Sequence, residues 1–220
     1  MTDDEFAALR VAYGDLAGLA ESLSERDSWC ATGCPGWAVR DVVFHLLGDA
    51  QRALVSLLTL SDGPADRTAV TYWIDSAGQH DPDSRGLRAT RTMASAWSLP
   101  YLVETYVLTS TAALALAGRT PPDTLVATQG HVLTARDLVA TFAVEAAVHH
   151  LDLVVELDRP GPGAEPLALV RQTLDGLLGR PVPVAWDDRT WALAGTGRRL
   201  LDAGEREALG ADADRLPLLC

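Results

Sequence analysis

The sequence predicts a mainly α-helical protein, a four-helix bundle over residues 1–157 followed by a small α+β tail over residues 164–220. Long apolar segments with helical spacing fill the first part of the chain, and Pro/Gly-rich stretches separate them. The run RPGPG at residues 159–163 is the clearest linker, because proline and glycine both interrupt regular structure. These observations favour one bundle core with a short appended unit.

Each expected bundle helix has its own signals. In the first, Leu9, Tyr13 and Leu16 recur at intervals of three and four, as on one helix face. Pro100 predicts a kink in the third helix, which Gly118 ends. The pair Thr134-x-x-Asp137 resembles a capping box at the start of the fourth. The four helices are expected over residues 3–23, 39–60, 84–117 and 134–157.

The tail shows a different pattern. Alternating apolar residues at 182–186 and 191–193 flank Asp187–Thr190, which predicts a β-hairpin. Short helices are expected on either side of it, over 166–178 and 200–209.

Composition narrows the classes of function. The 220-residue chain has a net charge of −12 and no run of basic residues, which disfavours binding to nucleic acid. The first ten residues are acidic and lack an apolar signal core, so we expect a cytoplasmic protein. The apolar stretch Leu99–Ala117 contains Glu104 and several hydroxyl residues, and it is interpreted as a buried bundle helix rather than a membrane span. The absence of Lys and Asn indicates a high-GC genome, as in an actinobacterium.

Ionisable residues interrupt the apolar fourth helix. Glu145 and His149 are four positions apart and therefore share one face, among apolar neighbours. His45 lies in similarly apolar company in the second helix. Two histidines and a glutamate from two helices would make a three-ligand site with an open position, which is typical of catalytic zinc. From spacing alone, a simple i,i+4 ion pair is an equally good interpretation.

Other known sites do not fit the pattern. A di-iron bundle needs Glu-x-x-His twice, and zinc proteases need His-Glu-x-x-His; neither occurs here. The sequence also lacks a Gly-x-Ser-x-Gly elbow and any lysine for a phosphate-binding loop.

Two motifs carry a resemblance to a known family. CPGWAVRDVVxHLxG at residues 34–48 and ExxxHHxDL at 145–153 resemble the signatures of the mycothiol-dependent maleylpyruvate isomerase family, within the wider DinB-like group. The resemblance implies a DinB-like bundle that holds a divalent metal, usually zinc, on His45, Glu145 and His149. Its open position would take water or the thiolate of mycothiol, a low-molecular-weight thiol.

The resemblance also implies a chemistry. The activated thiolate would add to an electrophilic small molecule, as an S-transferase or as a cis–trans isomerase. Arg198 and Arg215 of the tail would hold a carboxylate of the substrate. The tail is shorter than the C-terminal domain of the best-known members, so the natural electrophile stays open.

Nearby groups have less defined roles. Asp41 and Asp49 are placed to orient His45 through its other ring nitrogen, although Asp41 equally suits the helix N-terminus. Cys34 is expected to be apolar filler, and Trp37 a core plug that fixes the loop to the second helix.

Three alternatives to the thiol enzyme remain. They are a non-catalytic metal- or ligand-binding bundle, a thiol-independent metal hydrolase with Asp41, Asp49 or Glu104 as base, and a purely structural bundle. A homodimer is left open.

Overall fold

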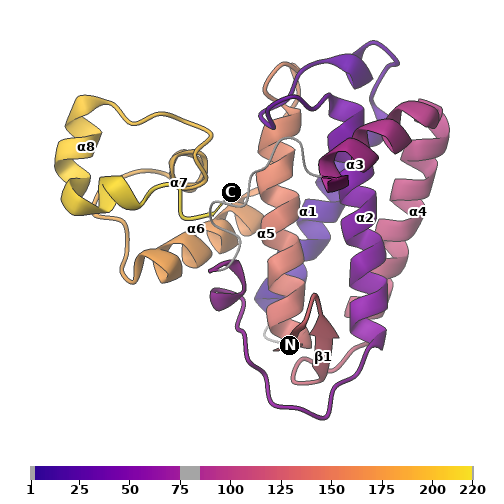
Figure 1. Cartoon of the computed structure of the whole chain (residues 1–220), viewed down its shortest axis with the longest axis horizontal. Helices are drawn as coiled ribbons and strands as arrows, with labels where there is room; N and C mark the ends of the chain where they lie inside the picture. Colours follow the sequence, from indigo (N-terminus) through magenta and orange to yellow (C-terminus); the bar gives the residue numbers. More distant parts are fainter. Residues whose placement is uncertain (1–2, 75–84, 220) are drawn as a thin grey trace.

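The computed structural model describes residues 3–74 and 85–219 of the chain. Four long helices lie side by side and form a bundle (Figure 1). This confirms the mainly α-helical fold with a four-helix bundle. The bundle helices are α1 (Asp3–Glu21), α2 (Val39–Leu58), α4 (Leu99–Ala117) and α5 (Ala135–Leu153).

Helix α5 is the centre of the molecule, because 15 of its 19 residues are buried. One side of α5 packs against α1 and α2, and the other packs against α6 (Ala164–Leu178) of the tail. Thr134 caps its start by accepting a hydrogen bond from the Asp137 backbone N–H at 3.1 Å, as the sequence predicts. An all-round buried helix explains why its apolar pattern has no single face.

The long helix expected over 84–117 is two helices, α3 (Arg85–Ala96) and α4, joined at Trp97 and Ser98. Residue 84 lies outside the described residues. Pro100 is in the first turn of α4, where a missing N–H breaks no helical hydrogen bond, so it starts a helix instead of kinking one. The interpretation of α4 as a buried helix is only partly right, since about one face of it is covered.

A β-hairpin that the sequence reading missed closes one end of the bundle. Strands β1 (Leu125–Thr128) and β2 (His131–Thr134) pair in antiparallel register across Gln129 and Gly130, whose φ values are 48° and 84°. Positive φ at both positions is typical of a type I′ turn, which Gly favours.

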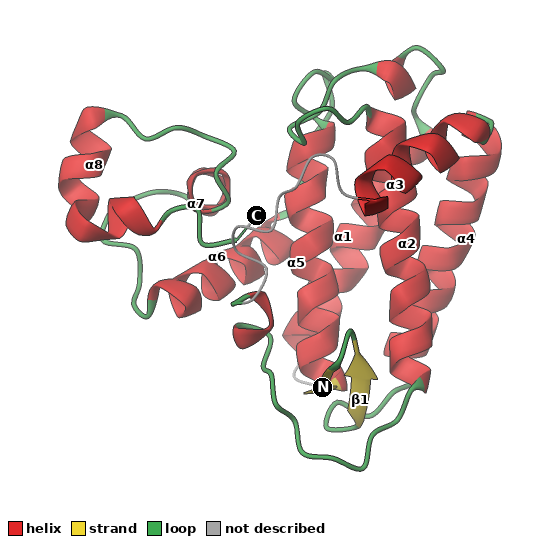
Figure 2. Ribbon diagram, in the orientation of Figure 1, coloured by secondary structure: helices red, strands yellow, loops and turns green. Residues whose placement is uncertain are grey.

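The hairpin predicted in the tail is wrong. Residues 188–195 form helix α7 (Asp188–Gly195), because the Asp187 carboxylate accepts a hydrogen bond from the Thr190 N–H at 2.6 Å and caps it. The described tail is helical, with α8 (Ala203–Leu209) beyond α7, and it lies beside the bundle (Figure 2). Its core includes Trp191 and one side of α5. The division into two domains stays a prediction.

Opposite effects are expected from glycine-to-alanine substitution at two sites. Gly130→Ala forces a β-carbon into a left-handed conformation and should lower the free energy of unfolding by about 1 kcal/mol. Gly14→Ala, at an exposed position inside α1 where nothing lies within 4 Å, should raise it by about 0.5–1 kcal/mol. Urea unfolding measures both; a stabilising Gly130→Ala would exclude the type I′ turn.

Candidate metal centre

The three side chains predicted as ligands meet between α2 and α5. The Glu145 Oε1 atom lies 3.3 Å from His45 Nε2 and 3.5 Å from His149 Nε2. The two imidazole rings stand edge to face, with centroids 4.7 Å apart. All three side chains are half-buried, so one side of the group stays open to a ligand. The structure therefore brings together a His/Glu/His set from two helices.

The spacing of these atoms suits a metal ion. Tetrahedral zinc with bonds of about 2.0–2.1 Å places neighbouring ligand atoms about 3.3–3.4 Å apart. The three candidate ligand atoms all lie within 4.8 Å of one another, and the distances from Glu145 Oε1 to the two imidazole nitrogens are close to the tetrahedral value. Two nitrogen donors and one carboxylate with an open side are the donor set of catalytic zinc. The residues present thus fit the group.

Electrostatics prepare Glu145 to act as a ligand. Burial alone would raise its pKa, but hydrogen bonds from His149 and His45 outweigh burial and hold the pKa well below its usual range. The carboxylate is therefore ionised at neutral pH. A cation in the same place would take over this neutralising role from the imidazole hydrogen bonds, so metal and protons compete for the site.

A buried aspartate holds His149 from behind. His149 Nδ1 lies 2.9 Å from Asp152 Oδ2, and the Asp152 side chain is fully buried. A carboxylate at Nδ1 fixes the ring so that Nε2 faces Glu145, and such an outer partner strengthens a histidine ligand. Burial lowers the pKa of His149, but Asp152, Cys34 and Glu145 together raise it well above the ordinary value.

Arg198 supplies the charge that balances Asp152. Its Nε and Nη2 atoms donate to the two carboxylate oxygens at 2.7 and 2.8 Å, and Nη1 donates to the Thr196 carbonyl. Burial would raise the pKa of Asp152, but His149 and Arg198 lower it strongly. The predicted substrate-binding arginine thus reaches the site, with its donors engaged by protein atoms.

Arg215 does not join the cluster. Its described contacts are the carbonyls of Leu177 and Leu178 and the carboxylate of Asp212, all within the tail. These bonds satisfy backbone groups at the C-terminal end of α6. A role for Arg215 in holding the substrate therefore has no support in this geometry.

The two aspartates of α2 take different positions. Asp41 accepts a hydrogen bond from the Ala38 N–H at 2.9 Å and serves the helix N-terminus, as one interpretation expected. Asp49 lies beside His45 Nε2, the nitrogen that faces Glu145, rather than beside the other nitrogen as predicted. Its Oδ1 accepts a hydrogen bond from Arg52 at 2.8 Å, and Arg52 also donates a hydrogen bond to the Tyr72 hydroxyl. The expectation that Asp49 orients His45 by binding the ring nitrogen that faces away from Glu145 is wrong.

Cys34 is more than filler. Its Sγ lies 3.1 Å from Asp152 Oδ2 and 3.6 Å from His149 Nδ1, so it forms a second cluster of metal-binding groups with them. Arg198 already neutralises Asp152 there and would repel a cation. The Nε2 side of His149 is therefore the better candidate position for a metal ion. The sequence did not predict the contact between Cys34 and Asp152, although the i,i+3 spacing of His149 and Asp152 indicates that these two residues can pair.

Two further residues neighbour these groups. The Trp37 ring, 9% exposed, lies 5.5 Å from the His45 ring and joins the core as a plug beside the site. The neighbouring His150 lies on another side of α5, with its Nε2 3.1 Å from the Pro160 carbonyl in the linker. Cys220, like His80, lies outside the described residues.

Comparison with known proteins identifies a family over the part of the chain that carries these residues. A family model described as the mycothiol maleylpyruvate isomerase N-terminal domain matches residues 9–154. The chain belongs to this family. The match includes all three candidate metal ligands and both motifs.

Two solved structures share the fold. They are crystal structures of a mycothiol-dependent maleylpyruvate isomerase and of its histidine-to-alanine variant. Each has a TM-score of 0.55, and they are 13% and 14% identical to this chain. The alignment covers 78% of this chain and 67% of each of theirs. No curated protein matches the chain. At this identity the structures establish the DinB-like fold alone.

Removing the charge of Asp152 should weaken metal binding. Asp152→Asn keeps the shape but loses the carboxylate that fixes His149, and outer partners of this kind contribute about 10–100-fold in metal affinity. Zinc affinity by competition with a chromophoric chelator measures the loss. Asp212→Asn is the matched control, because Asp212 pairs with arginines remote from the cluster. Equal affinities in both variants would contradict the role of Asp152.

A methyl group at Gly33 should disturb the same carboxylate. A β-carbon there would lie 2.3 Å from Asp152 Oδ1 and 3.2 Å from its Cα, and the Gly33 N–H donates to the Asp152 carbonyl at 3.1 Å. Gly33→Ala should cost about 2 kcal/mol of stability and weaken zinc binding. Gly48→Ala, on α2 with nothing within 4 Å, should do neither. Thermal unfolding and chelator competition test both variants.

Proposed function

We propose that this protein is a zinc-dependent enzyme that uses mycothiol to attack an electrophilic small molecule. The product either keeps the thiol, as in an S-transferase, or releases it after isomerisation of a conjugated double bond. Family membership supports the thiol, and the convergence of His45, Glu145 and His149 at ligand spacing carries the proposal. The cytoplasm of an actinobacterium is where we expect it to act.

The bound metal would stabilise a thiolate at neutral pH, as cations do for coordinated thiols. The protein's own residues then have separate tasks. His45 and Glu145 hold the cation from two helices, and Asp152 keeps His149 from turning away. Trp37 covers the His45 ring and excludes water from that side.

The two arginines that were predicted to bind the substrate do not indicate which substrate the protein takes. Arg198 is engaged by Asp152, so a substrate carboxylate would have to displace a two-point ion pair. We therefore propose an electrophile that needs no free arginine at this point, and maleylpyruvate itself is not favoured.

Metal-dependent hydrolysis is the second candidate. Asp49 Oδ2 is buried, lies 3.3 Å from His45 Nε2 and has no hydrogen-bond partner among the described residues. A carboxylate oxygen in that place suits the activation of water at the open side of the site. Turnover without any thiol would favour this function.

Metal content is the first test. Elemental mass spectrometry should find about one zinc per chain in the purified protein and none in His149→Ala. His131→Ala, which removes a partly exposed histidine paired with Asp66, should keep the metal. The loaded protein should convert activated alkenes or epoxides in the presence of mycothiol, and the His149 variant should not. Failure to bind zinc even when it is added would overturn the proposal, and bound metal without any turnover would leave a binding protein.

A further inference from the structure

Helix α4 is unusually exposed for so apolar a segment. Over 18 consecutive residues of this helix the mean hydropathy is 1.2, yet only 28% of that stretch is buried. Tyr101 and Leu108 are 54% and 70% exposed. The other side of α4 packs against α2 and α1. An apolar helix with one uncovered face indicates a binding partner.

The exposed residues of α4 form one stripe. They recur at intervals of three and four, and Gly118 keeps helical dihedrals, so the stripe continues past the end of the helix. Leu108 lies in its first half and the small Ala115 in its second. We call the following residues the α4 stripe: Tyr101, Glu104, Leu108, Thr111, Ala115 and Arg119, all of them exposed.

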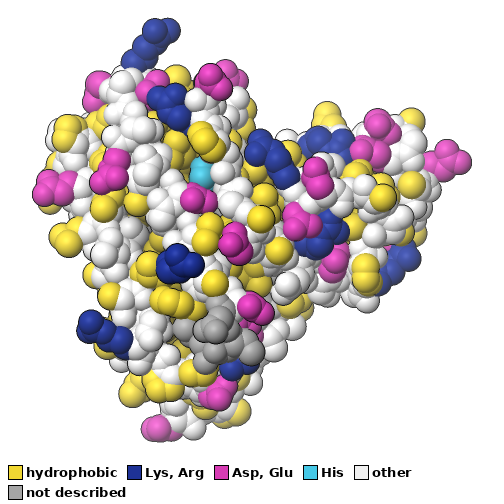
Figure 3. All heavy atoms as spheres, turned by 180° about the vertical axis from the view of Figure 1, so that it is seen from behind, with side chains coloured by type: hydrophobic (Ala, Val, Ile, Leu, Met, Phe, Trp, Pro, Cys, Tyr) yellow, Lys and Arg dark blue, Asp and Glu magenta, His cyan; other side chains and the backbone are white. Residues whose placement is uncertain are grey.

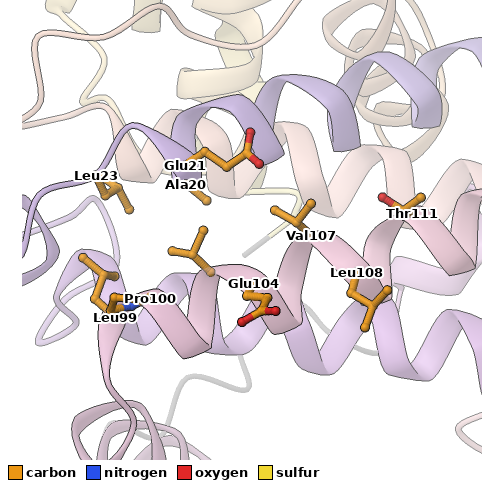
Figure 4. Close-up of a pocket in the computed structure, with 10 residues that line it drawn as sticks. Ala20, Glu21, Leu23, Leu99, Pro100, Glu104, Val107, Leu108 and Thr111 are labelled. Atoms are coloured by element: carbon orange, nitrogen blue, oxygen red, sulfur yellow. The ribbon is translucent and has the colours of Figure 1, made fainter.

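A groove runs beside the stripe. A hollow of about 670 Å³ lies between the end of α1 and α4, and Glu104, Leu108 and Thr111 line it along α4 (Figure 4). Its other lining residues include Ala20, Leu23 and Val103, so the floor is apolar. Hydrophobic side chains are also visible across the bundle surface on the side opposite to the view of Figure 1 (Figure 3). The stripe therefore adjoins a concave apolar surface into which side chains can fit.

The stripe is complementary to itself when it is reversed. A two-fold axis between Thr111 and Ala112 of antiparallel helices places Leu108 opposite Ala115 of the second copy. The same axis places Glu104 opposite Arg119 of the second copy. Large faces small, which allows helix axes to approach to about 8–10 Å, and negative faces positive. Neither Glu104 nor Arg119 has an ion-pair partner among the described residues.

We propose that two copies of this chain associate through the α4 stripe as an antiparallel, two-fold symmetric helix pair. A membrane is the less favoured partner, because one face of α4 is committed to α2 and α1 and the stripe itself carries two charges. A pair of 19-residue helices gives a contact at the lower end of stable interfaces. We therefore expect a dissociation constant on the order of micromolar.

Charge exchange tests the pairing directly. Sedimentation velocity of the full chain should show a concentration-dependent species of about twice the 23.4 kDa chain mass. Glu104→Arg alone and Arg119→Glu alone should each shift the protein to monomer, since each sets like charges opposite one another. The double variant should recover the dimer. An equimolar mixture of the two single variants should also form dimers, because both contacts are then between opposite charges.

Controls separate a lost interface from a lost fold. Glu207→Arg reverses an exposed charge on α8, in the tail, and should sediment as the wild type does. Circular dichroism should be unchanged in all variants, and zinc content should not depend on the α4 substitutions.

Three results would overturn the proposal. One is a wild-type protein that stays monomeric at about ten times the expected micromolar constant. Another is a dimer that both single variants retain, which would place the interface elsewhere. The third is a monomer that co-sediments with lipid vesicles through α4. None of them bears on the metal centre, so this inference and the proposed function fail independently.

Discussion

The buried carboxylate of Asp152 is the interaction on which the rest of the site depends. It meets His149, Cys34 and Arg198 at once, from α5, the loop before α2 and the segment after α7. A charge removed from water this completely is tolerated only when its partners are in place. Those three segments are therefore held to one another by the need to neutralise a single group. The orientation of His149, and with it the arrangement of the three candidate ligands, follows from that constraint.

Helix α5 shows how a core helix can carry chemistry. Its apolar residues serve both the bundle core and the tail core, which fixes the helix on all sides. Glu145 and His149 are then presented by a rigid element, and rigid placement is what a metal site needs. Three ionisable groups in the second half of α5 have partners: His45 for Glu145, Asp152 for His149, and the Pro160 carbonyl for His150. Removing one of these partners would leave a buried polar group unsatisfied and would lower the stability of the protein.

Much of the fold, and the placement of Glu145 and His149 side by side, could be predicted from local patterns. Apolar periodicity located the bundle helices, and the spacing of Glu145 and His149 placed both on one face. Contacts between distant segments could not be predicted, because nothing in the sequence near Asp152 specifies Arg198, 46 positions later. The prediction of a hairpin in the tail was wrong because the strong N-cap residue Asp187 favours a helix. The alternation of apolar residues that favoured a strand is short and weak by comparison. The Gln-Gly pair at 129–130 indicates a turn, but it was overlooked because it lies between two strongly helical segments.

The bidentate bond between Asp152 and Arg198 also bears on how such proteins can be assembled from parts. The bundle buries a negative charge, and the opposite charge is encoded beyond the linker. The two segments are therefore not interchangeable modules: a different tail has to deliver a cation to the same point, or the aspartate has to be lost with the original tail. Diversification of the tail is in this way tied to one residue deep in α5.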